Sequence, residues 1–173
     1  MNLELFLKIY SLVGQNVWLD RLGIFFARYS GYVLLIILVA VVFYFRKSAK
    51  NRLMFLEVMV SAIIARFVIT QAIRLFYHHP RPFDAIGIIN LIPESGWSFP
   101  SGHTTFYFAV ATSVWFYNRK LGWLFLATSL TMGLARIYVG VHWPFDILGG
   151  IAVGVIVACI VHRLSLKSFG KMT

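Results

Sequence analysis

The sequence predicts an all-α membrane protein, a polytopic bundle of about six helices with five or six of them transmembrane. Hydrophobic residues make up 60% of the 173 residues and charged residues only 13%, which is far more apolar than a soluble domain. The mean hydropathy is +0.79. Long apolar runs recur along the chain, and this length has room for about five or six spans of about 20 residues each. We therefore expect one integral membrane domain over residues 1–173.

The expected elements follow from the apolar runs in chain order. Residues 1–20 mix apolar positions with Glu4 and Lys8, which predicts an amphipathic helix that either lies in the interface or forms a weak first span. The connection 78–100 holds four prolines and two glycines, so it is predicted to be a loop that water can reach. The continuous apolar runs cover residues 32–45, 53–77, 101–117, 121–139 and 145–161, and the first extends back over 22–27.

Basic residues between these runs indicate the orientation of the chain. Their clusters are Arg46, Lys47, Lys50 and Arg52, then Arg119 and Lys120, then Arg163, Lys167 and Lys171. If the intervening helices span, all three clusters lie on one side, which the positive-inside rule assigns to the cytoplasm. The polar motifs described next then share the external face. The basic loop clusters and the motif arginines account for most of the Lys and Arg residues that give the net charge of +10. No nucleic-acid partner is therefore implied.

The first polar motif is R-x6-R-P, at Arg74 and Arg81. Pro80 and Pro82 forbid regular helix between the two arginines, so the chain turns there. Both guanidinium groups can then point into one cleft, where their planar forks suit phosphate oxygens and stay charged. The alternative interpretation is a pair of interfacial arginines that reach toward lipid headgroups.

The second motif is P-S-G-H at residues 100–103, directly before an apolar run. It resembles a helix start with Ser101 at or near the N-cap. Free backbone N–H groups and the positive end of the helix dipole favour an anion there, and Gly102 lets a phosphate approach closely. His103 falls in the first turn, where an imidazolium can donate its proton to a leaving oxygen. A structural histidine is the alternative.

The third motif is A-R-x5-H-x3-D, which contains Arg136, His142 and Asp146. Pro144 most naturally takes the first position of the next helix, which puts Asp146 in its first turn. A carboxylate four residues after His142 can accept from Nδ1–H, so that Nε2 carries the lone pair of a nucleophile. Arg136 would add a third guanidinium. A histidine and an aspartate that only cap a helix are the structural alternative.

Together these motifs resemble the type 2 phosphatidic acid phosphatase superfamily, whose pattern is K-x6-R-P, P-S-G-H and S-R-x5-H-x3-D. The resemblance covers the motifs, their order and spacing, and the apolar helices between them, from about residue 53 to the C-terminus. Arg74 stands where the family usually has lysine, which keeps the charge. Ala135 stands where it usually has serine, which removes a hydroxyl that helps to hold phosphate. The resemblance implies the helical core that this superfamily shares with vanadium haloperoxidases.

The resemblance also implies the roles of individual residues. His142 is expected to attack phosphorus and form a phosphohistidine, Asp146 to orient it, and His103 to protonate the departing oxygen. The residues expected to bind phosphate are Arg74, Arg81, Ser101, Gly102 and Arg136. No cofactor and no metal is implied, because these groups supply the positive charge and the carboxylates are scattered along the sequence.

Three stretches resemble bacterial undecaprenyl diphosphate phosphatases of the bacitracin-resistance type: R-P-F, S-F-P-S-G-H-T-T and R-I-Y-V-G-V-H-W-P-F-D. This resemblance implies an enzyme of the bacterial inner membrane that acts on the external face, with a lipid phosphate as substrate and membrane lipids as surroundings. Phosphatidylglycerophosphate, phosphatidate and lipid A phosphates stay open as substrates. A non-catalytic lipid-binding or transport protein is the alternative of another class. The apolar composition disfavours a haloperoxidase, because those enzymes are soluble.

Other polar residues lie beside the motifs or inside the spans. Glu94 and His79 are candidate headgroup contacts; the alternatives are a solvated loop acid for Glu94 and a histidine that merely lies at the interface for His79. Arg66 falls near the middle of its span and is interpreted as half of a structural ion pair whose partner the sequence does not identify; the alternative is that it lines a polar path. Small residues recur every four positions on the last helix, which predicts a face for close helix packing. They are Gly150, Gly154 and Ala158.

Overall fold

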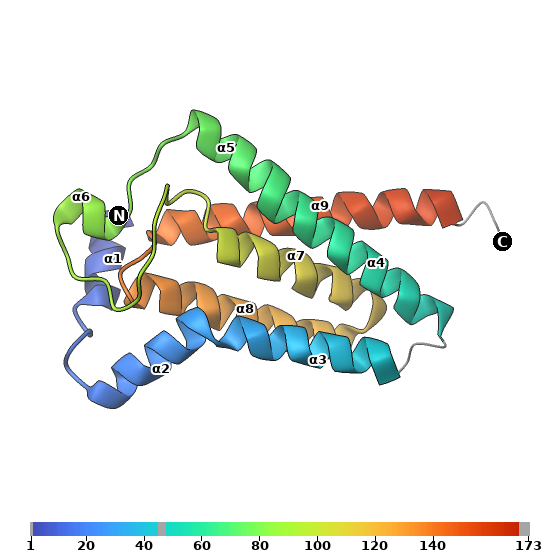
Figure 1. The fold of residues 1–173 in the computed structure, drawn as a ribbon, viewed down its shortest axis with the longest axis horizontal. Helices are drawn as coiled ribbons and strands as arrows, with labels where there is room; N and C mark the ends of the chain where they lie inside the picture. Colours follow the sequence, from blue (N-terminus) through green and yellow to red (C-terminus); the bar gives the residue numbers. More distant parts are fainter. Residues whose placement is uncertain (1, 45–47, 170–173) are drawn as a thin grey trace.

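The regular elements of the computed structural model, which describes residues 2–44 and 48–169, are all helices (Figure 1). This confirms the all-α membrane fold. The helices are α1 (Asn2–Tyr10), α2 (Val17–Arg28), α3 (Ser30–Tyr44), α4 (Ala49–Ile63), η1 (Ile64–Ile69), α5 (Thr70–Phe76), α6 (Pro82–Ile86), α7 (Gly102–Tyr117), α8 (Arg119–Tyr138) and α9 (Pro144–Phe169). Helix η1 is π-helical and joins α4 and α5 into one long element.

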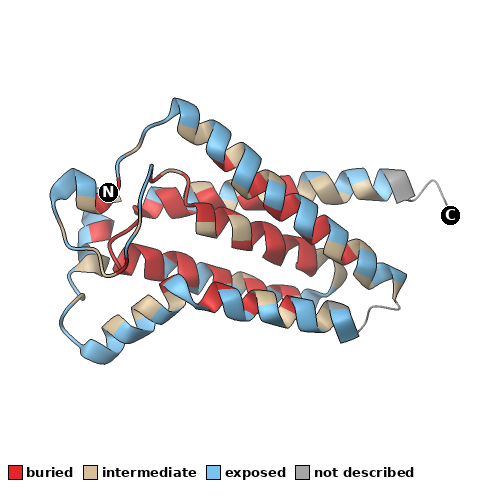
Figure 2. Ribbon diagram, viewed as in Figure 1, coloured by how far each residue is buried: buried red, intermediate tan, exposed pale blue. Residues whose placement is uncertain are grey.

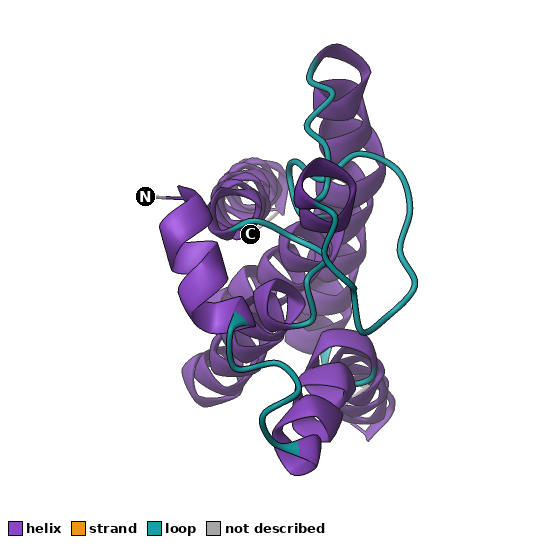
Figure 3. Cartoon of the chain, turned by 90° about the vertical axis from the view of Figure 1, so that its left-hand side faces the viewer, coloured by secondary structure: helices purple, strands orange, loops and turns teal. Residues whose placement is uncertain are grey.

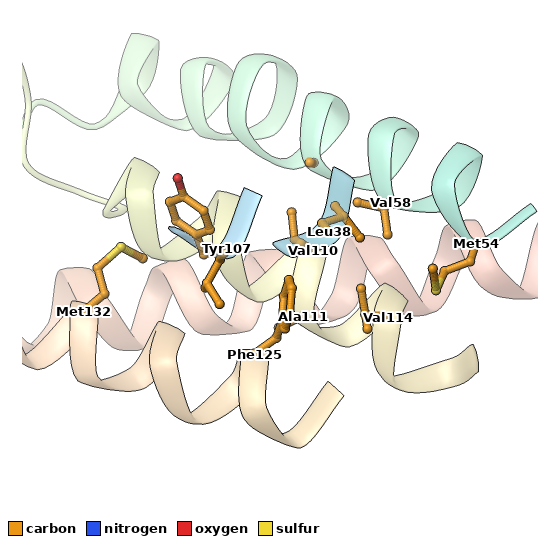
Figure 4. Close-up of a cluster of buried hydrophobic side chains, with 11 residues drawn as sticks. Leu38, Met54, Val58, Tyr107, Val110, Ala111, Val114, Phe125 and Met132 are labelled. Atoms are coloured by element: carbon orange, nitrogen blue, oxygen red, sulfur yellow. The ribbon is translucent and has the colours of Figure 1, made fainter. Parts of the chain in front are cut away.

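Helix α7 is the centre of the bundle, with α4, α8 and α9 packed around it. Of its 16 residues, 11 are buried and none is exposed, whereas the outer helices expose one side (Figure 2). A helix that is apolar or small all round has no face suited to water, so it is most stable inside. Figure 4 shows Val110 and Val114 of α7 between Phe125 of α8 and Val58 of α4. This packing fixes the start of α7, on which one motif lies.

Three segments are long and apolar enough to cross a bilayer, namely Ala49–Phe76, Arg119–Tyr138 and Pro144–Lys167. The pair Val17–Arg28 and Ser30–Val41, bent by 47°, makes a fourth if it crosses as one. By length and composition the described residues thus supply three or four spans, fewer than the five or six expected. Helix α7 explains part of the difference, because its 16 residues fall short of the about 20 that a span needs.

The N-terminal segment explains the rest of the difference, because residues 1–20 are not one helix. Helix α1 ends at Tyr10, and Asn16 caps the start of α2 with its side chain. Figure 3 shows α1 lying across the end of the bundle, whose helices are seen end-on. Phe6 is fully buried there, with its ring centroid 5.0 Å from that of Trp143. Of the two alternatives, the short helix across the bundle end fits the interfacial one.

The two ends of the bundle differ in chemistry. The loops between α5 and α7 and between α8 and α9 meet at the end that α1 covers (Figures 1 and 3). The starts of α4 and α8 and the end of α9 lie at the other end, and these carry Lys50, Arg119 and Lys167. The polar motifs and the basic clusters are therefore separated by the length of the bundle.

Helix α9 packs against α7 through the small residues that the sequence singled out. A Cβ atom added at Gly150 would lie 2.8 Å from the carbonyl oxygen of Ser101, and one at Gly154 would lie 2.6 Å from that of Thr105. Ala158 is fully buried. These contacts confirm the predicted packing face and bring the starts of the two helices together.

Candidate active site

His142 and Asp146 lie together at the start of α9, buried, with His142 Nδ1 3.3 Å from Asp146 Oδ2. Pro144 begins the helix, as its position in the sequence predicts. The backbone N–H of Trp143 donates to the same carboxylate oxygen at 2.8 Å, and the Ser98 hydroxyl also donates to it. Because Nδ1–H faces a carboxylate fixed by these donors, Nε2 is the nitrogen left with a lone pair.

The start of α7 adjoins this pair. Ser101 is the N-cap and is fully buried, and its N–H donates to the backbone carbonyl of Asp146 at 3.0 Å. Gly102 and His103 follow in the first turn. The hydrogen bond from Ser101 to Asp146 brings this first turn next to the His142–Asp146 pair. The second and third motifs therefore meet at one place, called the pocket below, where the positive end of α7 favours an anion.

Both arginines of the first motif reach the same place. Arg74, in the last turn of α5, donates from Nη2 to the carbonyl of Pro100 at 2.9 Å. Arg81 is buried just before α6, and its Nη1 lies 3.4 Å from His142 Nε2. Its guanidinium also donates to the carbonyls of Ser95, Gly96 and Val141, at 3.0, 2.8 and 2.9 Å. Arg81 thus fixes the loop while flanking the nitrogen that would attack.

Arg136, in the last turn of α8, is buried and forms an ion pair with Glu94 through Nη2. The other oxygen of Glu94 lies 3.8 Å from Arg81 Nη2. Glu94, expected as a headgroup contact, therefore lies in the cationic pocket as an internal partner of two arginines assigned to phosphate. Its side chain stays 23% exposed, so it can move toward solvent.

His79, a candidate headgroup contact, lies against the carboxylate of Asp146. His79 Nδ1 is 3.4 Å from Asp146 Oδ1, with 27% of the His79 side chain exposed. Sequence reasoning also missed Ser98, whose Oγ lies 3.3 Å from His142 Nδ1 and whose N–H donates to the carbonyl of His79. Its one signal was its place two residues before P-S-G-H, which many loop serines share.

Arg66 corrects another expectation. It forms no ion pair with a carboxylate among residues 2–44 and 48–169, so the interpretation as a structural ion pair is wrong. Its side chain lies over the start of α7, where a Cβ added at Gly102 would be 2.6 Å from Arg66 Nε. The pocket therefore has a fourth arginine at its edge.

Several donors in this pocket have no acceptor. Nη1 of Arg66, Nε of Arg74 and Nε of Arg136 are buried, and none has a hydrogen-bond partner in the part of the chain that the structure describes. Each buried donor without a partner costs about 1–3 kcal/mol. An anion with several acceptor oxygens would satisfy them, which makes phosphate a suitable ligand.

Burial and neighbouring charge set the protonation of the pocket. Burial lowers the pKa of the His142 imidazole well below its usual value, and the charge of Arg136 lowers it further. The ring is therefore neutral and nucleophilic at neutral pH. Burial also lowers the pKa of Arg81 to about 10, so its guanidinium remains a cation. Within the described ranges, no group of three His, Cys, Asp or Glu side chains is arranged to hold a metal ion.

Known proteins resemble this chain in sequence and in fold. The profile of the PAP2 superfamily matches residues 53–169. The undecaprenyl-diphosphatase BcrC of Bacillus subtilis is 35% identical over 166 residues, which cover 95% of this chain and 84% of that protein. The bacitracin transport permease protein BcrC of Bacillus licheniformis is 29% identical over 169 residues, or 96% and 82%. The crystal structure of Aquifex aeolicus LpxE matches at a TM-score of 0.73 and 32% identity, covering 94% of each chain.

Proposed function

This chain belongs to the PAP2 superfamily, and from that premise we propose that it is a membrane lipid phosphatase that hydrolyses undecaprenyl diphosphate to undecaprenyl phosphate. The observation that carries the proposal is the convergence of three distant motifs. Arg81 Nη1 lies 3.4 Å from His142 Nε2, and Ser101 N–H donates to the Asp146 carbonyl. A nucleophile, its orienting carboxylate, an acid and several cations thus share one buried pocket.

The first step is an in-line attack on the terminal phosphorus. His142 Nε2 forms the P–N bond while Asp146 accepts from Nδ1–H and stabilises the positive charge that the ring gains. Arg74 and Arg136, with backbone N–H groups at the start of α7, bind the equatorial oxygens. The bond to the leaving oxygen breaks as this occurs, and His103 can donate a proton to that oxygen.

The second step is hydrolysis of the phosphohistidine. His103 accepts a proton from a water molecule, whose oxygen attacks the phosphorus and releases inorganic phosphate. The P–N electron pair returns to His142, which becomes neutral again because the buried site and its arginines disfavour the charged ring. Positive charge comes from the protein throughout, so we expect turnover to persist when divalent metal is chelated.

The choice of lipid rests on similarity and on the setting of the pocket. The named activity of the Bacillus subtilis relative is that of an undecaprenyl-diphosphatase. The outer faces of α3 and α5 expose large apolar side chains, among them Ile36 and Phe76 at 68% and 89%. A lipid tail can therefore stay in the bilayer while its headgroup enters the pocket. We place the site on the external face of the bacterial inner membrane, because the basic clusters mark the other end as cytoplasmic.

The test is phosphate release from a panel of lipids by the purified protein in one detergent. The panel holds undecaprenyl diphosphate, phosphatidylglycerophosphate, phosphatidate and lipid A, and each is assayed with wild type, with His142→Ala and with EDTA. We expect the highest kcat/KM with undecaprenyl diphosphate, a loss of about 10⁴-fold or more in His142→Ala, and no effect of EDTA. A higher kcat/KM with another lipid would overturn the substrate but keep the chemistry.

The same assay also tests the non-catalytic alternative, a lipid-binding or transport protein. The name of the Bacillus licheniformis relative, a transport permease protein, is consistent with that alternative. A transport or binding protein on this core would release no phosphate from any lipid, and His142→Ala would leave its lipid binding unchanged. Full activity of His142→Ala, or activity only with added metal, would contradict the mechanism.

A further inference from the structure

Arg66 has no task in the mechanism above, although it is a charge within a membrane span. It lies on η1, and π-helical turns are frequent at functional sites. Its Nη1 is buried without a hydrogen-bond partner, and it forms no ion pair with the described carboxylates. The Phe67 ring lies 5.4 Å from the Arg66 guanidinium and provides a cation–π contact, but it offers Nη1 no acceptor. A buried intramembrane donor without an acceptor is costly, so a bound anion is the natural reason for it.

Arg66 lies on one side of the pocket. Its side chain covers Gly102, because a Cβ added there would lie 2.6 Å from Arg66 Nε and 2.7 Å from its Cζ. Arg66 therefore lies over the first turn of α7, in which His103 is the next residue after Gly102.

In an in-line displacement the attacking and leaving atoms lie on opposite sides of phosphorus. In the proposed mechanism His142 attacks, so His103, which protonates the leaving oxygen, would stand on the departing side. Arg66, over the turn that begins with Gly102 and His103, would stand there with it. In a diphosphate the leaving group is itself a phosphate, so its negative charge would lie beside Arg66.

We propose that Arg66 binds the second phosphate of a diphosphate substrate, the phosphate that departs with the lipid. The inference rests on the proposed function and adds the group that selects a diphosphate. As the His142 Nε2 to phosphorus bond forms, the bond from that phosphorus to the bridging oxygen breaks. The electron pair stays on the bridging oxygen, which becomes a terminal oxygen of the lipid monophosphate. Arg66 neutralises the charge that collects there.

A cation suits a phosphate leaving group, because that leaving group departs as an anion. A phosphate monoester substrate expels an alkoxide, which is strongly basic and needs the proton that His103 can give. A departing lipid phosphate has its second pKa at about 6 and is a stable anion at neutral pH. It can therefore depart without a proton, and fixed positive charge beside it stabilises the charge that it gains. Arg66 should therefore matter for diphosphates and little for ligands with one phosphate.

The experiment compares Arg66→Gln and Arg66→Lys with wild type in two measurements. Turnover of farnesyl diphosphate is measured in detergent, where we expect kcat/KM of Arg66→Gln to fall about 10²- to 10³-fold. Binding of inorganic pyrophosphate and of inorganic phosphate is measured from the rise in melting temperature with ligand concentration, which needs no turnover. The Kd for pyrophosphate should rise about tenfold or more, while that for phosphate changes less than about threefold. The kcat/KM and Kd values of Arg66→Lys should lie between those of wild type and those of Arg66→Gln.

The matched control is Arg74→Gln, which removes an arginine from the terminal phosphate and should weaken both ligands alike. An unchanged phosphate Kd also shows that the Arg66 variants are folded with an intact pocket. Equal weakening of both ligands by Arg66→Gln, or wild-type turnover in it, would overturn the inference. If wild type hydrolyses no lipid phosphate at all, the proposed function fails and the inference fails with it. If wild type is active and Arg66→Gln weakens the binding of phosphate and of pyrophosphate equally, the inference fails while the proposed function stands.

Discussion

Glu94 pairs with Arg136 and Arg81 in the pocket, where the phosphate of a substrate would meet the same two guanidinium groups. A carboxylate at this position lowers the cost of holding buried cations together without ligand. It also competes with phosphate for them. Because Glu94 is partly exposed and lies on a loop, its side chain can move away from the two arginines when substrate binds.

Removing that charge should strengthen anion binding. For Glu94→Gln we expect the Ki of inorganic phosphate, as an inhibitor of lipid phosphate hydrolysis, to fall about tenfold. Asp84→Asn is the control, since it removes one negative charge nearby without breaking an ion pair to the site arginines. A Ki that stays the same or rises in Glu94→Gln would mean that the carboxylate helps to build the pocket and does not compete for it.

The charge state of His142 is the second residue-level consequence. Because burial and Arg136 lower its pKa, the neutral nucleophile persists as the pH falls and is lost only well below the ordinary histidine value of about 6.5. Proton titration followed by NMR of ¹³C-labelled histidine in detergent measures this directly, with His142→Ala to assign the signal. A His142 midpoint at or above about 6.5 would contradict the account of the pocket.

At the scale of elements, the α7–α9 contact holds the second and third motifs in register. A Cβ added at Gly154 would lie 2.6 Å from the Thr105 oxygen and 2.9 Å from the Ala109 nitrogen, both backbone atoms that cannot turn away. The two helices would have to separate. That movement would stretch the hydrogen bond from Ser101 N–H to the Asp146 carbonyl.

Gly154→Ala should therefore cost both stability and activity. We expect the melting temperature to fall by about 2–12 °C, from about 1–3 kcal/mol of overpacking at about 2–4 °C per kcal/mol. Ile156→Ala on the same helix is the control, because that side chain is 56% exposed and faces away from α7. Equal losses of melting temperature and of activity in the two variants would show that stability and activity do not depend on the close approach of α7 and α9.

The sequence predicted those parts of the site that depend on local rules. Ser101 as N-cap and Pro144 as first residue of α9 follow from helix-end preferences, and these place His103 and Asp146. The position of Arg66 over Gly102 and the pairing of Glu94 depend on how distant helices pack, which no local pattern encodes. Apolar composition predicted the helices but not where each of them ends, because an apolar run alone does not fix a helix end.

At the scale of the whole molecule, the bundle separates the end that carries the three motifs, proposed as the catalytic end, from a basic end (Figure 1). A membrane-impermeant maleimide tests which end faces outward, applied to spheroplasts that express single-cysteine variants on a Cys159→Ala background. Ile89→Cys lies in the loop at the catalytic end, where Ile89 is 79% exposed. We expect it to react in intact spheroplasts, and the control Lys120→Cys to react only after permeabilisation. The reverse pattern would move the active site to the cytoplasm.

The central claim is that His142 takes up phosphate from a substrate held by three converging segments. Its most direct test is to mix the protein with undecaprenyl diphosphate carrying ³²P in the terminal phosphate, quench within milliseconds in alkaline detergent, and map the label by proteolysis. The account predicts ³²P on the peptide that contains His142, a larger amount in His103→Ala because water attack is slowed, and none in His142→Ala. Label that persists in His142→Ala, or turnover without any labelled protein in either wild type or His103→Ala, would contradict it.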